Sequence, residues 1–323
     1  SPSLNLVKPR FFVVGEELVD AFNEIRHQVP GAEHPCYWLA DRDTLQDSGH
    51  TPDGWINLSL RQASQSEQNL PDSLRVRMKD PCFYIYTSGT TGLPKASIMS
   101  HGKWIKAYGG FGHSGLGLGS SDVLYLTLPC YHNNAVTVCW GSVLAGGAAI
   151  ALRRKFSASA FWPDVARYQA TSFGYIGELC RYLLNQPVST HERDNSLTSM
   201  IGNGLRPAIW HEFKARFGID RIAEFYASSE GNIAFTNVFN FDNTVGFTPA
   251  TFAIVHYDLE SDRPTRNAQG FLEKVSAGQP GLLISEISKK FPFDGYTDPA
   301  KSEAVILRNV FKQGDAWFNT GDL

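Results

Sequence analysis

The middle of the chain, residues 80–232, alternates two kinds of hydrophobic pattern. Short apolar runs rich in β-branched and aromatic side chains are typical of buried strands. The segments between them place apolar residues every three or four positions, which is typical of amphipathic helices. Strands are predicted at residues 82–87, 96–99, 123–128, 148–152, 172–176, 199–201 and 222–226. Helices are predicted at residues 101–108, 134–144 and 178–184, in the segment carrying Phe161, Val165 and Tyr168, and from Pro207 through Ile209, Trp210, Phe213 and Phe217.

This alternation predicts an α/β fold with a doubly wound, mostly parallel sheet. In such sheets, ligands bind at the carboxyl ends of the strands. Ser157 is expected to cap the helix that follows it. Before residue 75 the pattern is weaker, with a strand predicted at 11–14 and a helix at 18–25. After about residue 240, helical periodicity fades and short apolar runs alternate with turn residues, which predicts a smaller β-rich lobe.

One stretch, residues 135–152, contains no charged side chain over 18 residues. That is the minimum length of a membrane-spanning helix. Gly146 and Gly147 divide the stretch, however, and the apolar run after them is typical of a strand. We therefore expect a buried helix followed by a buried strand rather than a membrane span.

The composition narrows the function classes. With 323 residues, 42% of them apolar and 19% charged, the chain can bury a large core, and disorder is not expected. A net charge of −3 provides no basic field for nucleic acid. The five cysteines have no C-x-x-C spacing, so neither a disulfide framework nor a zinc site is expected. A reducing, cytoplasmic location fits these thiols, and residues 1–9 do not resemble a signal peptide.

A glycine-rich loop follows the strand predicted at residues 82–87. The stretch YTSGTTGLPK, residues 86–95, combines hydroxyl side chains, glycines and a lysine. Glycines let the backbone approach an anion closely, and successive N–H groups can cradle it. The lysine adds a point charge suited to phosphate. This combination favours a phosphate-binding loop over the glycine turn of a simple β-hairpin.

Two better-known glycine motifs do not fit the sequence. The Walker pattern fails because Pro94 precedes Lys95 and Ala96 follows it. The stretch GFGHSG, residues 110–115, matches G-x-G-x-x-G, but a helix rather than a strand is predicted before it. The acidic residue that ribose binding would need about 20 residues further on is also missing. We therefore expect residues 110–115 to form a flexible loop.

Further candidate ligands lie where strands are predicted to end. In AEFYASSEGN, residues 223–232, Tyr226 offers a ring for stacking and Glu230 offers a carboxylate. A carboxylate beside phosphates usually binds Mg²⁺, whereas the alternative is an ordinary strand end with a solvated glutamate. The stretch IGNGLRP, residues 201–207, predicts a glycine turn against which a flat base can rest. In WFNTGDL, Asp322 offers a carboxylate for ribose hydroxyls.

The same stretch also permits a hydrolase interpretation. Residues 227–231 approximate the G-x-S-x-G elbow of serine hydrolases, with Ser229 as the nucleophile. Asp242 and His256 lie downstream, but their spacing has no recognisable signature. A serine esterase is therefore a formal alternative.

In this order, the stretches resemble one superfamily, the adenylate-forming enzymes, which comprise acyl-CoA synthetases, peptide-synthetase adenylation domains and luciferases. YTSGTTGLPK matches their signature phosphate loop, FYASSE resembles the Tyr-Gly-x-Thr-Glu motif, and NTGDL resembles the Thr-Gly-Asp motif. Further stretches look like the fatty acid transport protein and very-long-chain acyl-CoA synthetase branch, namely RKFSASAFW, YIGELCRYLLNQP, GNGLR and AEFYASSE. The resemblance extends from about residue 81 to the end of the sequence.

The resemblance implies two α/β lobes and a small β-rich, distorted-barrel lobe. The expected boundaries are residues 1–118, with the phosphate loop at 86–95, then 119–238 and 239–323. The implied activity is that of a fatty acid–CoA ligase for long or very long chains. A fatty carboxylate would attack the α-phosphate of ATP, giving acyl-AMP and pyrophosphate, and the thiol of CoA would then displace AMP. The carboxylate and the triphosphate repel each other, and the family overcomes this by aligning the triphosphate and neutralising its charge. The resemblance therefore implies Mg²⁺ as well as ATP and CoA.

Three alternative functions stay open beside this one. The first is a CoA ligase for bulky carboxylates such as bile acids. The second is a non-catalytic transport protein that binds fatty acid or nucleotide. The serine esterase is more distant. All imply small-molecule partners and no nucleic acid, and because the family is often found at membranes, peripheral membrane association is an alternative to a purely cytoplasmic location.

Carried over residue by residue, the resemblance assigns a nucleotide site. The pyrophosphate end of ATP would contact Thr87, Ser88, Gly89, Thr90, Thr91, Gly92 and Lys95. Adenine would lie against Gly202, Asn203 and Gly204, with Tyr226 stacked on it. Ser229 would lie near the α-phosphate, Glu230 would bind Mg²⁺, and Asp322 would bind ribose.

The catalytic candidates implied by the resemblance are Lys95, Glu230 and His132. His132, in LPCYHN, takes a family position near the acyl pocket, but a packed core histidine is an equally good interpretation. The walls of the acyl pocket are expected to include Trp140, Phe173 and Tyr175.

The chain also departs from the family pattern. Ala227 replaces a glycine, and its methyl group is expected to weaken nucleotide binding, whereas Ser229 in place of threonine keeps the hydroxyl. Family members continue through a hinge into a mobile C-terminal domain that carries the lysine promoting adenylation, while this sequence stops at Leu323. We therefore expect an incomplete chain that is poorly active alone.

Overall fold

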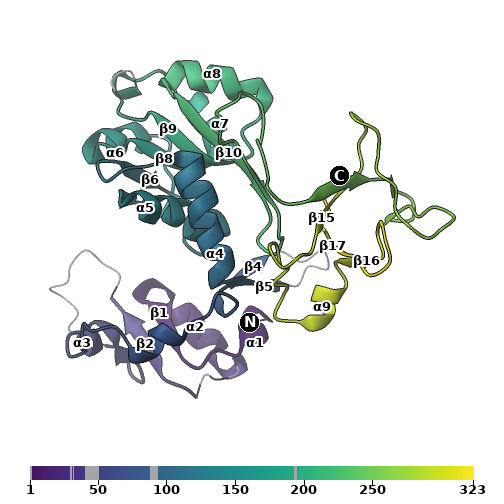
Figure 1. Cartoon of the computed structure of the whole chain (residues 1–323). Helices are drawn as coiled ribbons and strands as arrows, with labels where there is room; N and C mark the ends of the chain where they lie inside the picture. Colours follow the sequence, from purple (N-terminus) through teal and green to yellow (C-terminus); the bar gives the residue numbers. More distant parts are fainter. Residues whose placement is uncertain (1, 30, 32, 41–50, 88–93, 193–194) are drawn as a thin grey trace. The chain divides into compact units, whose positions relative to one another are not determined.

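The computed structural model describes residues 2–29, 31, 33–40, 51–87, 94–192 and 195–323 (Figure 1). The chain divides into two compact units. The first consists of Ser1–Arg77 and Tyr86–Ala96, and the second of Met78–Ile85 and Ser97–Leu323. The lobe boundaries expected from the sequence stay a prediction.

The first unit is built around a small parallel sheet. β1 (Phe12–Gly15), β2 (Cys36–Leu39) and β3 (Ile56–Asn57) pair in that order. Phe22 of α2 (Val19–Ile25) packs against Phe12, with ring centroids 5.0 Å apart. The strand and helix predicted before residue 75 are therefore confirmed to within one residue. The other helices of this unit are α1 (Pro2–Val7), η1 (Glu16–Leu18), η2 (Arg26–Gln28), α3 (Leu58–Gln62) and η3 (Pro71–Arg75).

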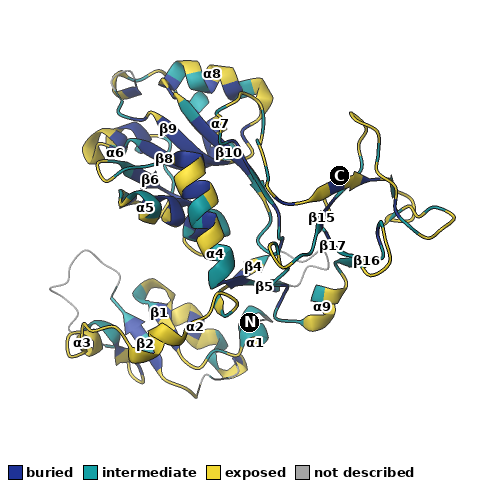
Figure 2. Ribbon diagram, viewed as in Figure 1, coloured by how far each residue is buried: buried dark blue, intermediate teal, exposed yellow. Residues whose placement is uncertain are grey.

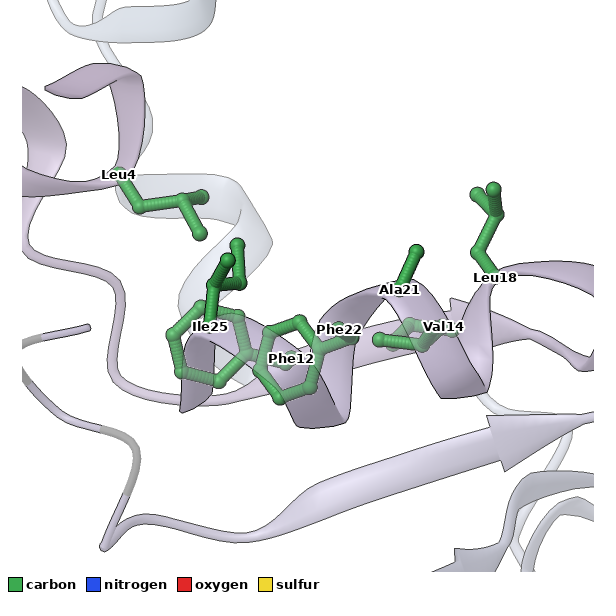
Figure 3. A pocket seen from close by; sticks show the side chains of 8 residues that line it. Leu4, Phe12, Val14, Leu18, Ala21, Phe22 and Ile25 are labelled. Carbon is green, nitrogen blue, oxygen red and sulfur yellow. The ribbon is translucent and has the colours of Figure 1, made fainter. Parts of the chain in front are cut away.

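An apolar pocket of about 310 Å³ lies between α1, β1 and α2 (Figure 3). All of its lining residues are hydrophobic: Leu4, Phe12, Val13, Val14, Leu18, Ala21, Phe22 and Ile25. A binding site for an ionised ligand needs polar groups that orient the charge. This pocket offers none and shares no residue with the sequence motifs, so we interpret it as a packing seam.

β4 (Pro81–Thr87) and β5 (Lys95–Ser100) form a two-stranded sheet. They confirm the strands predicted at residues 82–87 and 96–99. Each strand begins in one unit and ends in the other, so the pair is where the chain passes between the units.

The second unit contains a six-stranded sheet in the order β11-β10-β9-β8-β6-β7. Its strands β6 to β10 pair in parallel, and β11 at the edge pairs antiparallel with β10. The doubly wound, mostly parallel sheet predicted from the sequence is thus confirmed. The strands are β6 (Val123–Leu126), β7 (Ala149–Leu152), β8 (Ser172–Ile176), β9 (Ser199–Asn203), β10 (Arg221–Ala227) and β11 (Ala234–Thr236).

Helices cover both faces of this sheet. Successive side chains of a strand point to opposite faces, so apolar residues in the central strands need packing partners on both sides. In β8, Phe173 packs against Phe161 of α6 with ring centroids 4.7 Å apart, whereas Gly174 lies against Cys139 of η5. The central strands are accordingly buried along most of their length (Figure 2). The helices of this unit are α4 (His101–Ala107), η4 (Tyr108–Leu116), η5 (Asn134–Cys139), α5 (Trp140–Gly146), α6 (Phe161–Tyr168), α7 (Gly177–Leu184), η6 (Thr190–Glu192), α8 (Pro207–Phe217) and α9 (Pro299–Glu303).

The prediction of a flexible loop at residues 110–115 is wrong. These residues lie in η4, a π-helix that continues directly from α4. A Cβ atom at Gly112 would come within 2.6 Å of the Cβ of Ala145, so glycine allows close packing against α5. Burial of Phe111 and Leu116 in the same helix outweighs the low helix propensity of its glycines. Because the segment extends a helix, the rejection of a dinucleotide fingerprint stands.

The uncharged stretch 135–152 forms η5, α5 and then β7, so the predicted order of helix and strand is confirmed. The expectation of a buried strand is wrong, because β7 lies at the edge of the sheet and only Ala151 of its four residues is buried. Gly147 ends α5 with a φ of 63°, a left-handed conformation that glycine adopts without strain. Across the described ranges, none of the helices has the length and apolar character needed to cross a membrane.

The predicted capping role of Ser157 is wrong. Ala160 is the N-cap residue of α6, and its N–H reaches the Ser157 hydroxyl at 3.4 Å. A turn formed by residues 158–160 delays the helix, so Ser157 stabilises that turn instead.

The C-terminal part of the second unit is β-rich, as predicted. β12 (Phe252–Val255), β15 (Leu282–Glu286), β17 (Ala316–Asn319) and β16 (Ile306–Arg308) form an antiparallel sheet in that order. β13 (Tyr257–Asp258) and β14 (Arg263–Pro264) form a separate hairpin. The core of this region contains Val255, Ile284, Val310 and Trp317.

Candidate functional site

Tyr226 and Asp322 meet at the carboxyl end of β10. The Tyr226 hydroxyl donates a hydrogen bond to Asp322 Oδ2, although the two residues are 96 positions apart in sequence. Burial, together with this hydrogen bond, raises the pKa of Tyr226, so the phenol stays protonated at neutral pH. Asp322 is exposed, and its carboxylate can therefore accept further hydrogen bonds from a ligand.

Glu230 supplies a second carboxylate just beyond the end of β10. The Tyr296 hydroxyl donates to Glu230 Oε1 at 2.9 Å, and Tyr296 is only 5% exposed. Burial, with the negative charge of Glu230, raises the pKa of Tyr296, so a neutral phenol fixes this carboxylate. Since the hydrogen bond engages Oε1, Oε2 is available to a cation as far as the described residues go.

Lys103 fixes the loop that carries Glu230. Its Nζ donates to the carbonyl oxygen of Ser229 at 2.6 Å. Ser100 caps α4 by accepting from the Lys103 N–H at 3.2 Å, and its hydroxyl donates to Asp294 Oδ2 at 2.6 Å. Burial lowers the pKa of Lys103 to about 8, against the opposing effect of the negative charges of Asp294 and Glu230. The ammonium group therefore stays largely charged at neutral pH.

Glu224 holds the glycine turn that follows β9. Its Oε1 accepts from the N–H groups of Gly204 at 2.5 Å and Leu205 at 3.2 Å, and its Oε2 accepts from the Tyr175 hydroxyl. The side chain is 4% exposed. Burial raises the pKa of Glu224 to about 7, against the lowering effect of the three hydrogen bonds.

The backbone of this turn is closely packed. Gly204 has a φ of 84°, in the left-handed region that favours glycine. A Cβ atom on Gly177, the first residue of α7, would lie 1.7 Å from the carbonyl oxygen of Gly204. Asn134 connects the same strand ends, because its Nδ2 donates to the Tyr175 carbonyl at 3.0 Å and to Asn203 Oδ1 at 3.1 Å.

The phosphate loop is only partly described. Ser88, Gly89, Thr90, Thr91 and Gly92 lie outside the described residues. Thr87 ends β4 and Lys95 begins β5, both within the first unit. The structure therefore brings together Tyr226, Asp322, Glu230 and the 202–204 turn on one unit, while the roles of Thr87 and Lys95 stay predictions.

The residues expected at the acyl pocket differ in how far they are exposed. His132 is exposed, so the alternative of a packed core histidine is wrong. Phe173 and Tyr175 are fully buried in the sheet core, and their place in the wall of an acyl pocket stays a prediction. Trp140 is 36% exposed at the start of α5.

The geometry around Ser229 is unlike that of a serine hydrolase. The elbow motif requires a strand, a sharp turn and then a helix, but β10 is followed by β11. Asp242 accepts hydrogen bonds from Trp210 at 3.0 Å and from Lys214 at 2.9 Å. Among the described residues, no histidine donates to or accepts from the Ser229 hydroxyl. The esterase interpretation therefore has no structural support here.

Sequence reasoning did not find three residues that support the site: Lys103, Glu224 and Tyr296. Lys103 and Tyr296 lie in mixed polar stretches that carry no signal. Glu224 carries the clearest signal, because a carboxylate stands in the middle of the apolar strand IAEFY. Buried charges need partners, so such a residue marks a local polar network even before the partners are known.

Comparison with known proteins shows which family this chain belongs to. Residues 4–270 match the model of the AMP-binding enzymes. The chain belongs to the AMP-binding enzyme family. This AMP-binding enzyme is 54% identical over 248 residues to the medium/long-chain-fatty-acid–CoA ligase FadD6 of Mycobacterium tuberculosis, covering 77% of this chain and 42% of that protein. It is 39% identical over 329 residues to long-chain fatty acid transport protein 6 of Mus musculus, covering 99% of this chain and 51% of that protein. The chain thus spans about half the length of the curated relatives it matches.

Solved structures share the fold at lower identity. ATP-bound MatB from Rhodopseudomonas palustris superposes with a TM-score of 0.75 at 21% identity, covering 98% of this chain and 57% of that one. The N-terminal domain of FACL13 from Mycobacterium tuberculosis gives a TM-score of 0.70 at 19% identity, covering 98% and 72%. The α/β architecture expected for the N-terminal part of an adenylate-forming enzyme is therefore confirmed.

Proposed function

We propose that this AMP-binding enzyme activates a fatty carboxylate with ATP, forming acyl-AMP, and transfers the acyl group to CoA. The observation that carries the proposal is the pairing of Tyr226 with Asp322 at the carboxyl end of β10. Two motifs almost one hundred residues apart converge at the edge of the sheet where α/β folds bind ligands. An exposed carboxylate and an aromatic ring suit the ribose and the base of a nucleoside.

Each side chain has a defined task in this proposal. The ring of Tyr226 stacks on adenine, and its hydrogen bond keeps the Asp322 carboxylate oriented toward the ribose hydroxyls. The turn at residues 202–204 presents backbone to the edge of the base. Lys103 holds the Ser229 carbonyl and so places the Ser229 hydroxyl and Glu230 next to the phosphates. Because these groups are already ordered by hydrogen bonds, little reorganisation accompanies nucleotide binding.

Glu230 fits a magnesium ion in this scheme. Mg²⁺ prefers oxygen ligands and is usually held by one or two carboxylates together with substrate phosphates. Glu230 offers such a carboxylate, and no cluster of three or more acidic, histidine or cysteine side chains capable of holding a metal occurs among the described residues. When bound, the ion would neutralise the phosphate oxygens. The hydrogen bond from the Tyr296 hydroxyl, at 2.9 Å, fixes the rotamer in which the Glu230 carboxylate would bind the ion.

The acyl substrate is proposed from the relatives. FadD6 is named a medium/long-chain-fatty-acid–CoA ligase, and other relatives are named long-chain fatty acid transport proteins. A long-chain fatty acid is therefore the first substrate to test, followed by bulkier carboxylates. The roles of Lys95 in pyrophosphate binding and of His132 near the acyl chain belong to the same proposal, as does peripheral membrane association.

Exchange of labelled pyrophosphate into ATP by the full-length protein tests the first half-reaction. Fatty acids of increasing chain length should each stimulate exchange to a different extent. Asp322→Ala should reduce the exchange, whereas Asp262→Ala is the matched control. Asp262 is also an exposed aspartate that accepts from a tyrosine, Tyr257, at 2.6 Å, but it lies in the β13–β14 hairpin.

Absence of exchange with any carboxylate would contradict the ligase. Saturable binding of ATP and fatty acid without exchange would instead support a non-catalytic transport protein. Ester hydrolysis without ATP, abolished by Ser229→Ala, would restore the hydrolase interpretation.

A further inference from the structure

Glu224 connects three structural elements beneath the proposed base site. It stands on β10, accepts from the hydroxyl of Tyr175 on β8, and accepts from two backbone N–H groups of the turn after β9. It also pairs with Gly202 in the β9–β10 register. We infer that Glu224 is a positioning residue for the nucleotide base, acting through the 202–205 turn rather than by touching ATP. This inference rests on the proposed function, because the base site belongs to that proposal.

The chemistry of the turn requires an acceptor at this place. The backbone N–H groups of Gly204 and Leu205 follow the last residue of β9, so the strand ladder does not satisfy them. Leu205 is buried, and a buried N–H without a partner costs free energy comparable to a lost hydrogen bond. A single carboxylate oxygen accepts from both groups, which fixes the orientation of their peptide planes and of the left-handed Gly204.

The Glu224 carboxylate lies on the same strand as the Tyr226 ring that is proposed to stack on the base. Residues two apart on a strand face the same side of the sheet, so Glu224 lies on the face of β10 that carries Tyr226. The base would then contact two surfaces that share one strand: the Tyr226 ring and the turn held by Glu224. Displacing the turn would shift one surface against the other and weaken binding of the base while leaving the phosphates unaffected.

The groups that face Glu224 are neutral among the described residues. Tyr175 comes from β8 and Cys180 from α7, and burial raises the pKa of both well above neutrality. Glu224 itself is therefore the group whose charge changes near neutral pH. A protonated carboxyl keeps one oxygen for the two N–H groups, but that oxygen is a weaker acceptor than a carboxylate. Glutamine has the same shape as the protonated form and does not titrate.

The experiment measures the affinity of the full-length protein for two probes, Mg–ATP and Mg–tripolyphosphate, which has no base. Glu224→Met keeps the side-chain length but removes both acceptors, and it should weaken ATP binding about tenfold while changing tripolyphosphate binding less than about twofold. Tyr175→Phe removes only the donor to Oε2 and should change ATP affinity less than about twofold. Glu192→Gln is the matched control, since Glu192 is 3% exposed and pairs with Arg216 instead.

A pH series covers the case in which Glu224→Met fails to fold. The ratio of wild-type to Glu224→Gln affinity for ATP should rise about threefold from pH 6 to pH 8, because only the wild-type carboxyl gains charge over that range. The same ratio for Glu192→Gln should stay constant.

Two results would overturn the inference while leaving the proposed function intact. One is wild-type ATP affinity in a folded Glu224→Met variant. The other is an equal loss of ATP and tripolyphosphate binding, which would indicate general loosening of the fold. Failure of the wild-type protein to bind ATP at all would instead contradict the proposed function itself.

Discussion

The carboxylates at the two edges of the central sheet have different kinds of partner. At the amino edge, Glu192 is paired with Arg216, which comes from the last turn of α8, at 3.2 Å. At the carboxyl edge, Glu224 and Glu230 accept from tyrosine hydroxyls, and Glu224 also accepts from backbone N–H groups. The amino edge therefore neutralises its charge internally, because an unpaired buried charge is costly. The carboxyl edge holds both carboxylates with neutral donors: Glu224 is buried and supports the turn after β9, whereas the half-buried Glu230 keeps a carboxylate oxygen for a ligand.

The largest effect should come from breaking the ion pair at the amino edge. Arg216→Leu leaves the Glu192 carboxylate buried without its guanidinium and also removes donors to the carbonyls of Leu184 and Gln186. We expect the free energy of unfolding to fall by about 4 kcal/mol. Urea denaturation measures it, with the exposed Arg308→Leu as the control. A loss no larger than that of the control would show that the pair is not a stabilising feature.

The buried carboxyl at the other edge should make stability depend on pH. The pKa of Glu224 is about 7 in the folded protein against a usual value of 4.5, so the folded state binds the proton more tightly. Its contribution to stability is present at low pH and is lost as the pH rises from about 4.5 to about 7, by about 3 kcal/mol. Thermal unfolding of wild type and Glu224→Gln at pH 5 and pH 8 measures the difference. Parallel pH dependence of the two proteins would disprove the shift.

Asp322 should matter for nucleotide binding but not for stability. It is exposed, and its proposed partners are the ribose hydroxyls. Asp322→Ala should raise the KM for ATP about thirtyfold, since hydrogen bonds to a charged group contribute about 2 kcal/mol. The melting temperature should stay within about 2 °C of wild type. A similar rise in KM with Asp262→Ala would indicate an unspecific charge effect.

The smallest effect is expected at Tyr296. Tyr296→Phe keeps the ring buried but removes the hydrogen bond that fixes Glu230. The Mg²⁺ concentration that supports half-maximal pyrophosphate exchange should increase about fivefold, which corresponds to about 1 kcal/mol. Tyr257→Phe, which removes the equivalent bond to Asp262, should leave this concentration unchanged.

The sequence predicts the core of the fold well and its glycine-rich segments poorly. Hydrophobic periodicity located every strand of the central sheet except the edge strand β11, because burial imposes that pattern. The π-helix η4 escaped prediction because close contacts with Ala145 and Thr236, distant in sequence, stabilise its glycines. Ser157 failed as a cap since several residues along this segment can begin a helix and only packing selects among them.

The candidate site shows a similar division. Tyr226, Glu230 and Asp322 belong to motifs whose residue types were enough to single them out as candidate ligands. Lys103 and Tyr296 do not, because their contribution is a hydrogen bond to a partner more than 60 positions away. No local pattern specifies such a contact, so the structure was needed to find it.

The contact between Gly177 and the Gly204 carbonyl has a consequence for engineering this enzyme. A side chain at position 177 would need the space that the Gly204 carbonyl oxygen occupies, so any residue other than glycine would displace the 202–204 turn. Mutagenesis libraries aimed at the proposed base site should therefore leave residue 177 as glycine.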